Sequence, residues 1–249
     1  MKPLVIGHAA AAGEGPANTL AGVRASLDAA AEAMEIDIQI CADGVPVLMH
    51  DLTVDRTTNI SGRVRDLSLG ELQGADAGNG EPVPTLDQVF ALVAGQLTVM
   101  CELKVDHESG QTETDLVDAV AALVARHGAE PWTAIHSFDP EIVGTARRIA
   151  PTISAAIIAP RQDAPGFDRY LSAVVKRGAQ ALSLEYNCIT REYVIRAKRR
   201  QLSLWAWTAD NPEDWRRLVA VGVDGIITNV PHRLRAWLDH GRWTMDDGR

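Results

Sequence analysis

Residues 34–48 read MEIDIQICADGVPVL, and this stretch holds the pattern that organises the rest of the chain. Polar and apolar side chains alternate from Glu35 to Ile40, which is typical of a β-strand with one face against an apolar layer. Asp43 and Gly44 then separate this run from a second apolar run, which is the signal of a β-hairpin. The stretch therefore predicts a strand that turns back on itself instead of leading directly into a helix.

Short apolar runs alternate with amphipathic segments along the rest of the chain, as in the repeated strand-helix units of a parallel sheet. The expected strands are Leu4–His8, Met34–Ile40, Leu97–Lys104, Trp132–Phe138, Ser154–Ala159, Ala181–Tyr186, Ser203–Thr208 and Gly225–Asn229. The expected helices are Ala17–Ala31, Thr85–Ala94, Gln111–Arg126, Glu141–Ile149, Phe167–Arg177, Arg191–Arg200, Pro212–Val221 and Pro231–Asp239. This count and the length of 249 residues predict an α/β fold, a single TIM (β/α)8 barrel domain over residues 1–249 with an irregular insertion over residues 51–84.

The composition is that of a compact soluble globular protein, with 46% hydrophobic residues and a formal net charge of −9. This excess of negative charge argues against a nucleic-acid partner or an anionic membrane surface. No stretch approaches the ~18 apolar residues of a membrane span, and no secretory apolar core follows Met1. The three cysteines have no paired short spacing, which argues against a disulfide framework or a cysteine zinc site. We expect a cytoplasmic protein with no stable membrane insertion; the sequence does not indicate an oligomeric state.

Three carboxylates are expected inside the barrel or at its mouth. Glu35 and Asp37 share one face of their strand because side chains alternate, and Glu102 shares a face with Lys104 near the end of the third strand. Buried carboxylates repel one another, so a cation is expected among them. Three oxygen ligands suit one divalent cation, Mg²⁺ or Ca²⁺. The alternative is a structural salt bridge in which Lys104 neutralises Glu102 and Asp37.

Two histidines end strands beside these carboxylates. His8 ends the first strand and His50 ends the returning strand of the hairpin. A single terminal histidine is more often a cap or a hydrogen-bonding core residue, but two beside a carboxylate cluster could divide general-base and general-acid roles. Three further side chains are candidate substrate contacts: His136, Glu185 and Trp207. The structural alternatives are a hydrogen-bonded barrel histidine for His136 and an ion pair with an arginine for Glu185, whereas Trp205, on the same face as Trp207, is expected in the core.

These residues occur in the order found in the glycerophosphodiester phosphodiesterase family, which the sequence resembles along nearly its whole length. The stretches that carry the resemblance are His8-Ala9-Ala10, Pro16-Ala17-Asn18-Thr19, Glu35-Ile36-Asp37, Asp43-Gly44-Val45-Pro46-Val47, His50-Asp51, Asp55-Arg56-Thr57-Thr58, Pro84-Thr85-Leu86 and Glu102-Leu103-Lys104. The resemblance implies a TIM barrel, with His8 and His50 as the acid/base pair and Lys104 as a phosphate contact. It also implies that the metal ligands are Glu35, Asp37 and Glu102. The implied reaction is hydrolysis of a small-molecule phosphodiester to an alcohol and a phosphomonoester such as glycerol 3-phosphate.

Two positions depart from the family pattern. The arginine that follows the first histidine in the family is Ala9, and the glutamate of its Pro-Glu-Asn-Thr motif is Ala17. These changes remove one positive and one negative group from the expected mouth, which leaves the phosphate with the cation and Lys104. Two alternatives therefore stand beside hydrolysis. One is a catalytically idle phosphoester-binding barrel, and the other is a related barrel phosphodiesterase that forms a cyclic phosphate by attack of the substrate's own hydroxyl.

Overall fold

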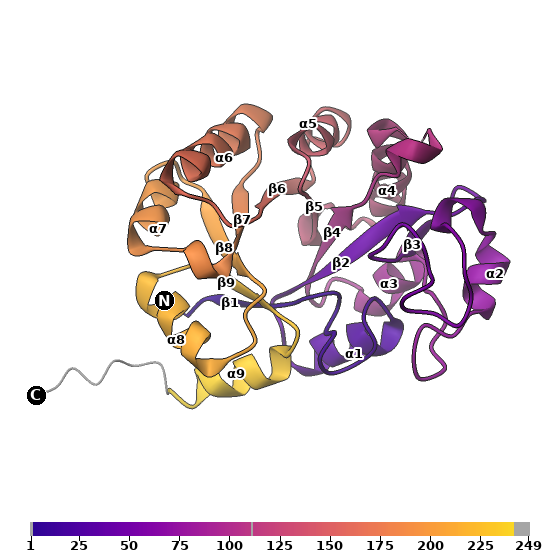
Figure 1. Ribbon diagram of the computed structural model, residues 1–249, viewed down its shortest axis with the longest axis horizontal. Coiled ribbons are helices and arrows are strands. Elements are labelled where there is room, and N and C mark those ends of the chain that lie inside the picture. Colours follow the sequence, from indigo (N-terminus) through magenta and orange to yellow (C-terminus); the bar gives the residue numbers. More distant parts are fainter. Residues whose placement is uncertain (1, 111, 242–249) are drawn as a thin grey trace, which may run out of the picture.

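A computed structural model describes residues 2–110 and 112–241, and its strands form a closed parallel barrel ringed by helices (Figure 1). Hydrogen bonding between β1 and β2 closes the ring, with Ile6 opposite Ala33 and Gly7 opposite Met34. The predicted TIM barrel is confirmed. In their order around the ring, its strands are β1 Leu4–Gly7, β9 Gly225–Thr228, β8 Ser203–Trp207, β7 Ala181–Glu185, β6 Ser154–Ala159, β5 Thr133–Ser137, β4 Thr98–Leu103 and β2 Ala33–Ile40.

The hairpin adds one strand outside this ring. β3, Pro46–Leu48, pairs antiparallel with the end of β2, so that Ile38 lies opposite Leu48. Gly44 has a φ of +74° at the turn, a conformation that favours glycine. The hairpin predicted from residues 34–48 is therefore present, and it projects from the end of β2 that also faces the barrel mouth.

The insertion after the hairpin is more ordered than the sequence predicts. It contains a 3-10 turn, η1, at Val64–Asp66 and a short helix, α2, at Leu69–Gly74. Its apolar side chains form a small core of their own with the hairpin, which includes Val47, Val54 and Leu72. Arg63 bonds both oxygens of Asp106, at 2.6 Å and 2.7 Å, and this ties the insertion to the loop that follows β4.

The remaining helices lie between the strands. Their bounds are α1 Leu20–Asp28, α3 Leu86–Val93, α4 Glu113–His127, α5 Pro140–Ile149, α6 Ala164–Arg177, α7 Arg191–Lys198, α8 Pro212–Val221 and α9 Pro231–Asp239, with 3-10 turns η2 His107–Ser109, η3 Glu130–Trp132 and η4 Tyr186–Cys188. The expected start of α1 at Ala17 is wrong: Asn18 has a φ of +55°, and the Thr19 hydroxyl accepts a hydrogen bond from the Gly22 amide to begin the helix at Leu20. The expected start of α4, Gln111, lies outside the described residues.

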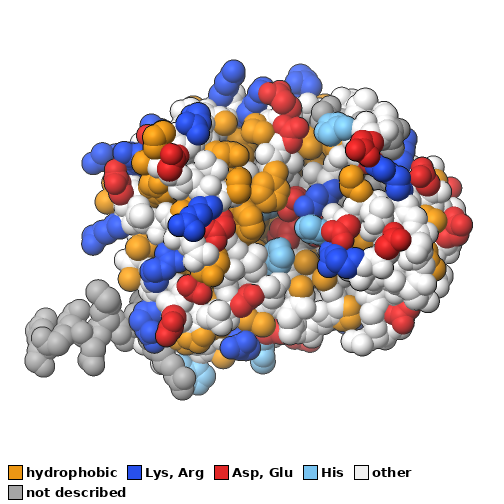
Figure 2. Space-filling model, in the orientation of Figure 1, with side chains coloured by type: hydrophobic (Ala, Val, Ile, Leu, Met, Phe, Trp, Pro, Cys, Tyr) orange, Lys and Arg blue, Asp and Glu red, His pale blue; other side chains and the backbone are white. Residues whose placement is uncertain are grey.

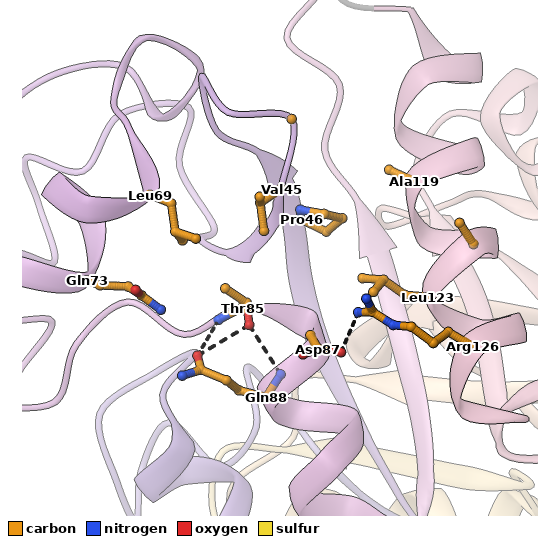
Figure 3. A pocket seen from close by; sticks show the side chains of 12 residues that line it. Val45, Pro46, Leu69, Gln73, Thr85, Asp87, Gln88, Ala119, Leu123 and Arg126 are labelled. Carbon is orange, nitrogen blue, oxygen red and sulfur yellow. Dashed lines mark hydrogen bonds and ion pairs between the residues drawn. The ribbon is translucent and has the colours of Figure 1, made fainter.

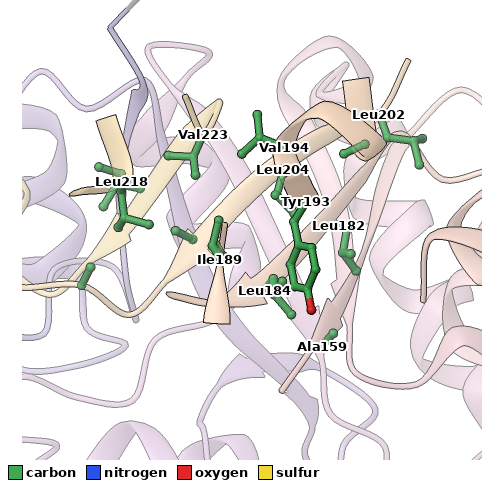
Figure 4. Packing of buried hydrophobic residues seen from close by; sticks show 14 of the residues in the cluster. Ala159, Leu182, Leu184, Ile189, Tyr193, Val194, Leu202, Leu204, Leu218 and Val223 are labelled. Atoms are coloured by element: carbon green, nitrogen blue, oxygen red, sulfur yellow. The ribbon is translucent and has the colours of Figure 1, made fainter. Parts of the chain in front are cut away.

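Apolar side chains fill the space between the strands and the helices. Ile36, Ile38 and Ile40 lie on the helix-facing side of β2, as their alternation predicts. On the other half of the barrel, Leu182 of β7 and Leu204 of β8 pack with Tyr193 of α7 (Figure 4). Burial of each apolar side chain of this size stabilises the folded state by about 1.5–3 kcal/mol relative to leaving it exposed to water.

A smaller apolar cluster fills the interior of the barrel itself: Ile6, Ala33, Met100, Ala134 and Ile227. The barrel is therefore a packed core, and it is at the C-terminal ends of the strands that functional side chains of such barrels gather. Cys41, Cys101 and Cys188 are free thiols. Among the described residues, no helix combines the length and the apolar character needed to cross a membrane.

Candidate active site

The C-terminal ends of the barrel strands surround a cavity of about 90 Å³. Figure 2 shows a hollow in this face of the molecule, where acidic, basic and histidine side chains come together. The side chains that line the cavity are His8, Glu35, His50, Glu102, Lys104, His136, Phe138, Ile158, Trp207 and Ile227. Of the nine predicted site residues, seven line this cavity, and Asp37 lies immediately beside it in the same carboxylate cluster.

The predicted carboxylates meet inside the barrel. Asp37 of β2 lies opposite Glu102 of β4 in the parallel register, and Glu35 lies two residues before Asp37 on the same face. One oxygen of each carboxylate lies within 4.8 Å of the others, and all three side chains are buried. The Oε1 of Glu35 has no hydrogen-bond partner among the described residues. A buried set of three oxygen donors with an unpartnered atom fits a hard cation, so this cluster could bind a metal ion.

Charge repulsion within this cluster is only partly relieved by Lys104. Its ammonium lies 3.2 Å from Asp37 Oδ1 and also contacts Glu102. Burial, followed by the charges of Asp37 and Glu102, raises the pKa of Glu35 well above its usual value. Burial also raises the pKa of Glu102, against the opposing effect of Lys104. The predicted salt bridge is thus present, but one lysine leaves the negative charge of three carboxylates in excess.

His8 is oriented by the last strand of the barrel. Its Nδ1 lies 2.7 Å from Oδ1 of Asn229, whose Nδ2 donates to Asp210 at 2.7 Å. Because the Asn229 amide nitrogen is already directed at a carboxylate, its oxygen accepts from His8, and His8 carries its proton on Nδ1. The Nε2 of His8 then faces the carboxylates, 3.9 Å from Glu35. Neither Asn229 nor Asp210 was predicted as a site residue, although the position of Asn229 at a strand end was an available signal.

His50 has a different partner. Its Nδ1 lies 2.6 Å from Oδ1 of Asp51, and Oδ2 of Asp51 accepts from Arg56 Nε at 2.5 Å. The Arg56 hydrogen bond, assisted by His50, lowers the pKa of Asp51 to about 2. Gln39 donates to the carbonyls of Met49 and Asp51, at 2.8 Å and 2.5 Å, and so holds the segment that carries His50. Gln39 shares the polar face of β2 with the carboxylates, but its partners could not be predicted.

The three candidate substrate contacts differ in position. His136 lines the cavity, is 2% exposed, and has no hydrogen-bond partner on either ring nitrogen among the described residues. Burial lowers its pKa to about 3, so the ring is neutral. Trp207 also lines the cavity, edge to face with Phe138 at 5.5 Å between centroids. Glu185 does not line it: its carboxylate accepts hydrogen bonds from the backbone and the side-chain amide of Asn187.

A second cavity of about 240 Å³ adjoins the first and shares His8 and His50 with it. Both positions that depart from the family pattern line this cavity, Ala9 and Ala17. The other lining residues are Ala12, Asn18, Asp37, Leu48, Met49, Arg56, Thr57 and Ala77. The small side chains leave open space beside the two histidines, and Arg56 is the cationic side chain on this wall.

A larger groove of about 630 Å³ lies between the hairpin, α3 and α4, and it shares no lining residue with the two cavities. Figure 3 shows Pro46 and Leu123 on its walls, with polar side chains that pair among themselves. Thr85 and Gln88 form the N-terminal cap of α3, and Asp87 pairs with Arg126. This groove lacks the side-chain chemistry that the barrel mouth brings together.

Comparison with known proteins agrees with this geometry. The sequence model of the glycerophosphoryl diester phosphodiesterase family matches residues 8–233. The chain belongs to this family. It is therefore a phosphoric diester hydrolase, and the resemblance stated from its motifs is confirmed.

Relatives match the chain along most of its length. The glycerophosphodiester phosphodiesterase of Caldanaerobacter subterraneus is 32% identical over 250 residues, which cover 94% of this chain and 97% of the relative. The crystal structure of the Agrobacterium tumefaciens glycerophosphodiester phosphodiesterase is 27% identical, with a TM-score of 0.79, and the match covers 95% of this chain and all of that one. An Oleispira antarctica phosphodiesterase, solved with the product sn-glycerol-3-phosphate, is 22% identical with a TM-score of 0.85, over 96% of this chain and 97% of that one.

Proposed function

We propose that this enzyme hydrolyses glycerophosphodiesters to an alcohol and glycerol 3-phosphate, with one divalent cation, Mg²⁺ or Ca²⁺, held by Glu35, Asp37 and Glu102. The observation that carries the proposal is the pairing of two differently oriented histidines with a buried carboxylate cluster. The activity of the Caldanaerobacter subterraneus relative supports the substrate class.

The cation and Lys104 have separate tasks in this proposal. When bound, the cation draws negative charge from a non-bridging oxygen of the phosphate. The unpartnered Oε1 of Glu35 and the excess of negative charge support its binding here. Lys104 lines the same cavity and offers the phosphate an ammonium from the β4 side. Electrostatic stabilisation of this kind is strongest in a buried, water-poor site.

The hydrogen bonds of the two histidines support distinct roles. His8 donates from Nδ1 to Asn229, so its Nε2 has a free lone pair and can take a proton from the attacking water. The Asp51 carboxylate next to His50 stabilises positive charge on that ring, so His50 can give a proton to the leaving alkoxide. The water oxygen forms a bond to phosphorus, the ester bond breaks, and one proton moves at each histidine.

The remaining candidates fit substrate binding. The neutral, buried and unpartnered ring of His136 can hydrogen-bond a substrate hydroxyl. Trp207 and Phe138 form an aromatic wall for the alcohol that leaves. Glu185 lies outside this cavity but opposite Trp207 in the register, so it can meet a hydroxyl only of a larger alcohol that extends beyond the cavity.

The test is incubation of the metal-free chain with glycerophosphocholine, with Mg²⁺ and Ca²⁺ added in turn, followed by phosphorus NMR. Appearance of glycerol 3-phosphate only after a cation is added supports the proposal. A cyclic phosphate as the first product favours attack by the substrate's own hydroxyl instead. Thermal stabilisation by the substrate without any product favours the idle barrel.

A further inference from the structure

Two cationic side chains line the paired cavities within the described part of the chain, Lys104 and Arg56. The ammonium of Lys104 already contacts both Asp37 and Glu102, which leaves one of its three donors for the phosphate. Arg56 has more donors available. Its Nε donates to Asp51, while its two terminal nitrogens have no hydrogen-bond partner among the described residues. Its side chain is 64% exposed, at the open side of the larger cavity.

Apart from the two histidines, the other polar side chains on the larger cavity and the Ala9 amide already have hydrogen-bond partners. The Ala9 amide donates to Glu35 at 3.0 Å. The side chain of Asn18 donates to Asp37 at 2.8 Å and accepts from the Asp37 amide. The hydroxyl of Thr57 contacts the sulfur of Met49. The terminal nitrogens of Arg56 are therefore the charged donors that this cavity offers to an incoming ligand.

Once a divalent cation is bound, the charges of the site no longer oppose an anion at this position. Four carboxylates, Glu35, Asp37, Asp51 and Glu102, face two cationic side chains, so one divalent cation brings the group to neutrality. A phosphodiester then adds one negative charge and the phosphomonoester product adds up to two. The hydrogen bond to Asp51 raises the pKa of Arg56 against the opposing effect of burial, and the charges of Asp51 and then of Asp37 raise it further, so Arg56 interacts electrostatically with a member of the carboxylate cluster.

We propose that Arg56 binds the phosphate group of the substrate through its terminal nitrogens, from within the cavity that Ala9 and Ala17 leave open. This rests on the proposed function, since it assigns a ligand contact in the same site. A guanidinium presents two parallel donors to two phosphate oxygens, which an ammonium cannot do. Because Nε of the same side chain holds Asp51, Arg56 binds the anion and supports His50 at once.

Calorimetric titration with glycerol 3-phosphate, in the presence of Mg²⁺ or Ca²⁺, tests the contact without any turnover. Arg56→Ala is expected to weaken binding about tenfold or more, the scale of a lost hydrogen bond to a charged group. The affinity of Arg56→Lys is expected to lie between the affinities of Arg56→Ala and the parent. The control is Arg65→Ala, which removes another arginine of the same insertion that does not line either cavity, and its affinity should stay within about twofold of the parent.

The outcomes separate this proposal from its alternatives. Unchanged affinity in Arg56→Ala, or an equal loss in Arg65→Ala, overturns it. If Arg56→Ala alters the pH profile of kcat but leaves the affinity for glycerol 3-phosphate unchanged, the proposal is also overturned, because Arg56 would then act only through Asp51. If the parent chain binds glycerol 3-phosphate through Arg56 but hydrolyses no diester, the proposed function fails and the Arg56 contact stands. If the parent hydrolyses diesters while Arg56→Ala binds glycerol 3-phosphate normally, the Arg56 contact fails and the proposed function stands.

Discussion

The Nδ1 of His8 lies 2.7 Å from the side-chain oxygen of Asn229, so the last strand of the barrel determines which ring nitrogen of His8 faces the cavity. The two residues meet because β1 pairs with β9, with Gly7 opposite Thr228. Asp210 holds Asn229 through both its side-chain amide and its backbone amide, at 2.7 Å and 2.8 Å. The pairing of β1 with β9, which forms part of the closed barrel, therefore also determines the orientation of His8.

Asn229→Leu should lower kcat because it removes the acceptor that holds His8 in one orientation and one tautomer. We expect a loss of about tenfold or more, with KM changed much less, since Asn229 lines neither cavity. Asp210→Asn should cause a smaller loss, because it weakens the anchor of Asn229 but leaves the His8 contact in place. Steady-state kinetics with glycerophosphocholine measure both effects, and a loss confined to KM would contradict the orienting role.

His8→Ala and His50→Ala should each slow hydrolysis of glycerophosphocholine about 100-fold or more. Their effects should differ with bis-p-nitrophenyl phosphate, whose leaving group needs little protonation. With this substrate, His50→Ala should lose much less of the hydrolysis rate than His8→Ala, because only the general acid becomes dispensable. The matched control is His232→Ala, at an exposed position of α9, for which we expect parental rates. Equal losses with both substrates would contradict the assignment of the acid.

Asp37→Asn should weaken metal binding and activity in parallel, since it removes a ligand charge from the centre of the carboxylate cluster. A decrease in metal affinity of at least about tenfold is expected, because loss of even indirect support at metal sites has effects of this size. Calorimetric titration of the metal-free protein with Mg²⁺ and Ca²⁺ measures it. Unchanged affinity would favour the purely structural salt bridge of Lys104.

Glu35→Gln should stabilise the metal-free protein at neutral pH. Burial and neighbouring carboxylates raise the pKa of Glu35 above its usual value of 4.5, so folding disfavours its charged form. The stability contributed by the protonated group is fully present below pH 4.5 and is lost as the pH rises towards the raised pKa. The variant should therefore melt higher than the parent at pH 8, with a smaller difference at pH 5.

Thermal unfolding in the presence of a chelator at both pH values measures this difference, with ~2–4 °C expected for each kcal/mol. Addition of Mg²⁺ or Ca²⁺ should reverse the order, because the parent then gains a ligand charge that the variant lacks. A parent that is the more stable protein at pH 8 without metal would contradict the repulsion inferred for this cluster.

Ala94→Gly should stabilise the fold by about 1 kcal/mol. Ala94 ends α3 in the left-handed conformation, with φ +46° and ψ +41°, and it is exposed, so glycine relieves strain without loss of packing. Ala91→Gly, at an exposed position inside the same helix, should instead destabilise it by about 1 kcal/mol. Chemical denaturation of both variants measures the pair. Effects of the same sign would contradict the account.

Several features of this protein follow from the sequence alone because they depend on local geometry. Alternation along residues 35–40 puts Glu35 and Asp37 on one face and three isoleucines on the other, whatever the partner strands are. Asp43 and Gly44 specify a tight turn, and the repeated strand-helix pattern leads to the barrel, which the structure confirms. The family also follows from motifs that are short and ordered. The single-domain organisation and the cytoplasmic location stay predictions.

Other features were decided only by the tertiary structure. The Asn229 partner of His8 lies 221 residues away, and only closure of the barrel brings the two together. Two further contacts depend on the path of the insertion through space. These are the hydrogen bond from Gln39 to the segment that carries His50 and the ion pair between Arg63 and Asp106. Glu185 shares its strand face with Ser183 as predicted, yet its carboxylate bonds Asn187 instead of entering the cavity. Side-chain alternation is set by the covalent chain, whereas hydrogen-bond partners across a closed barrel depend on how distant segments pack.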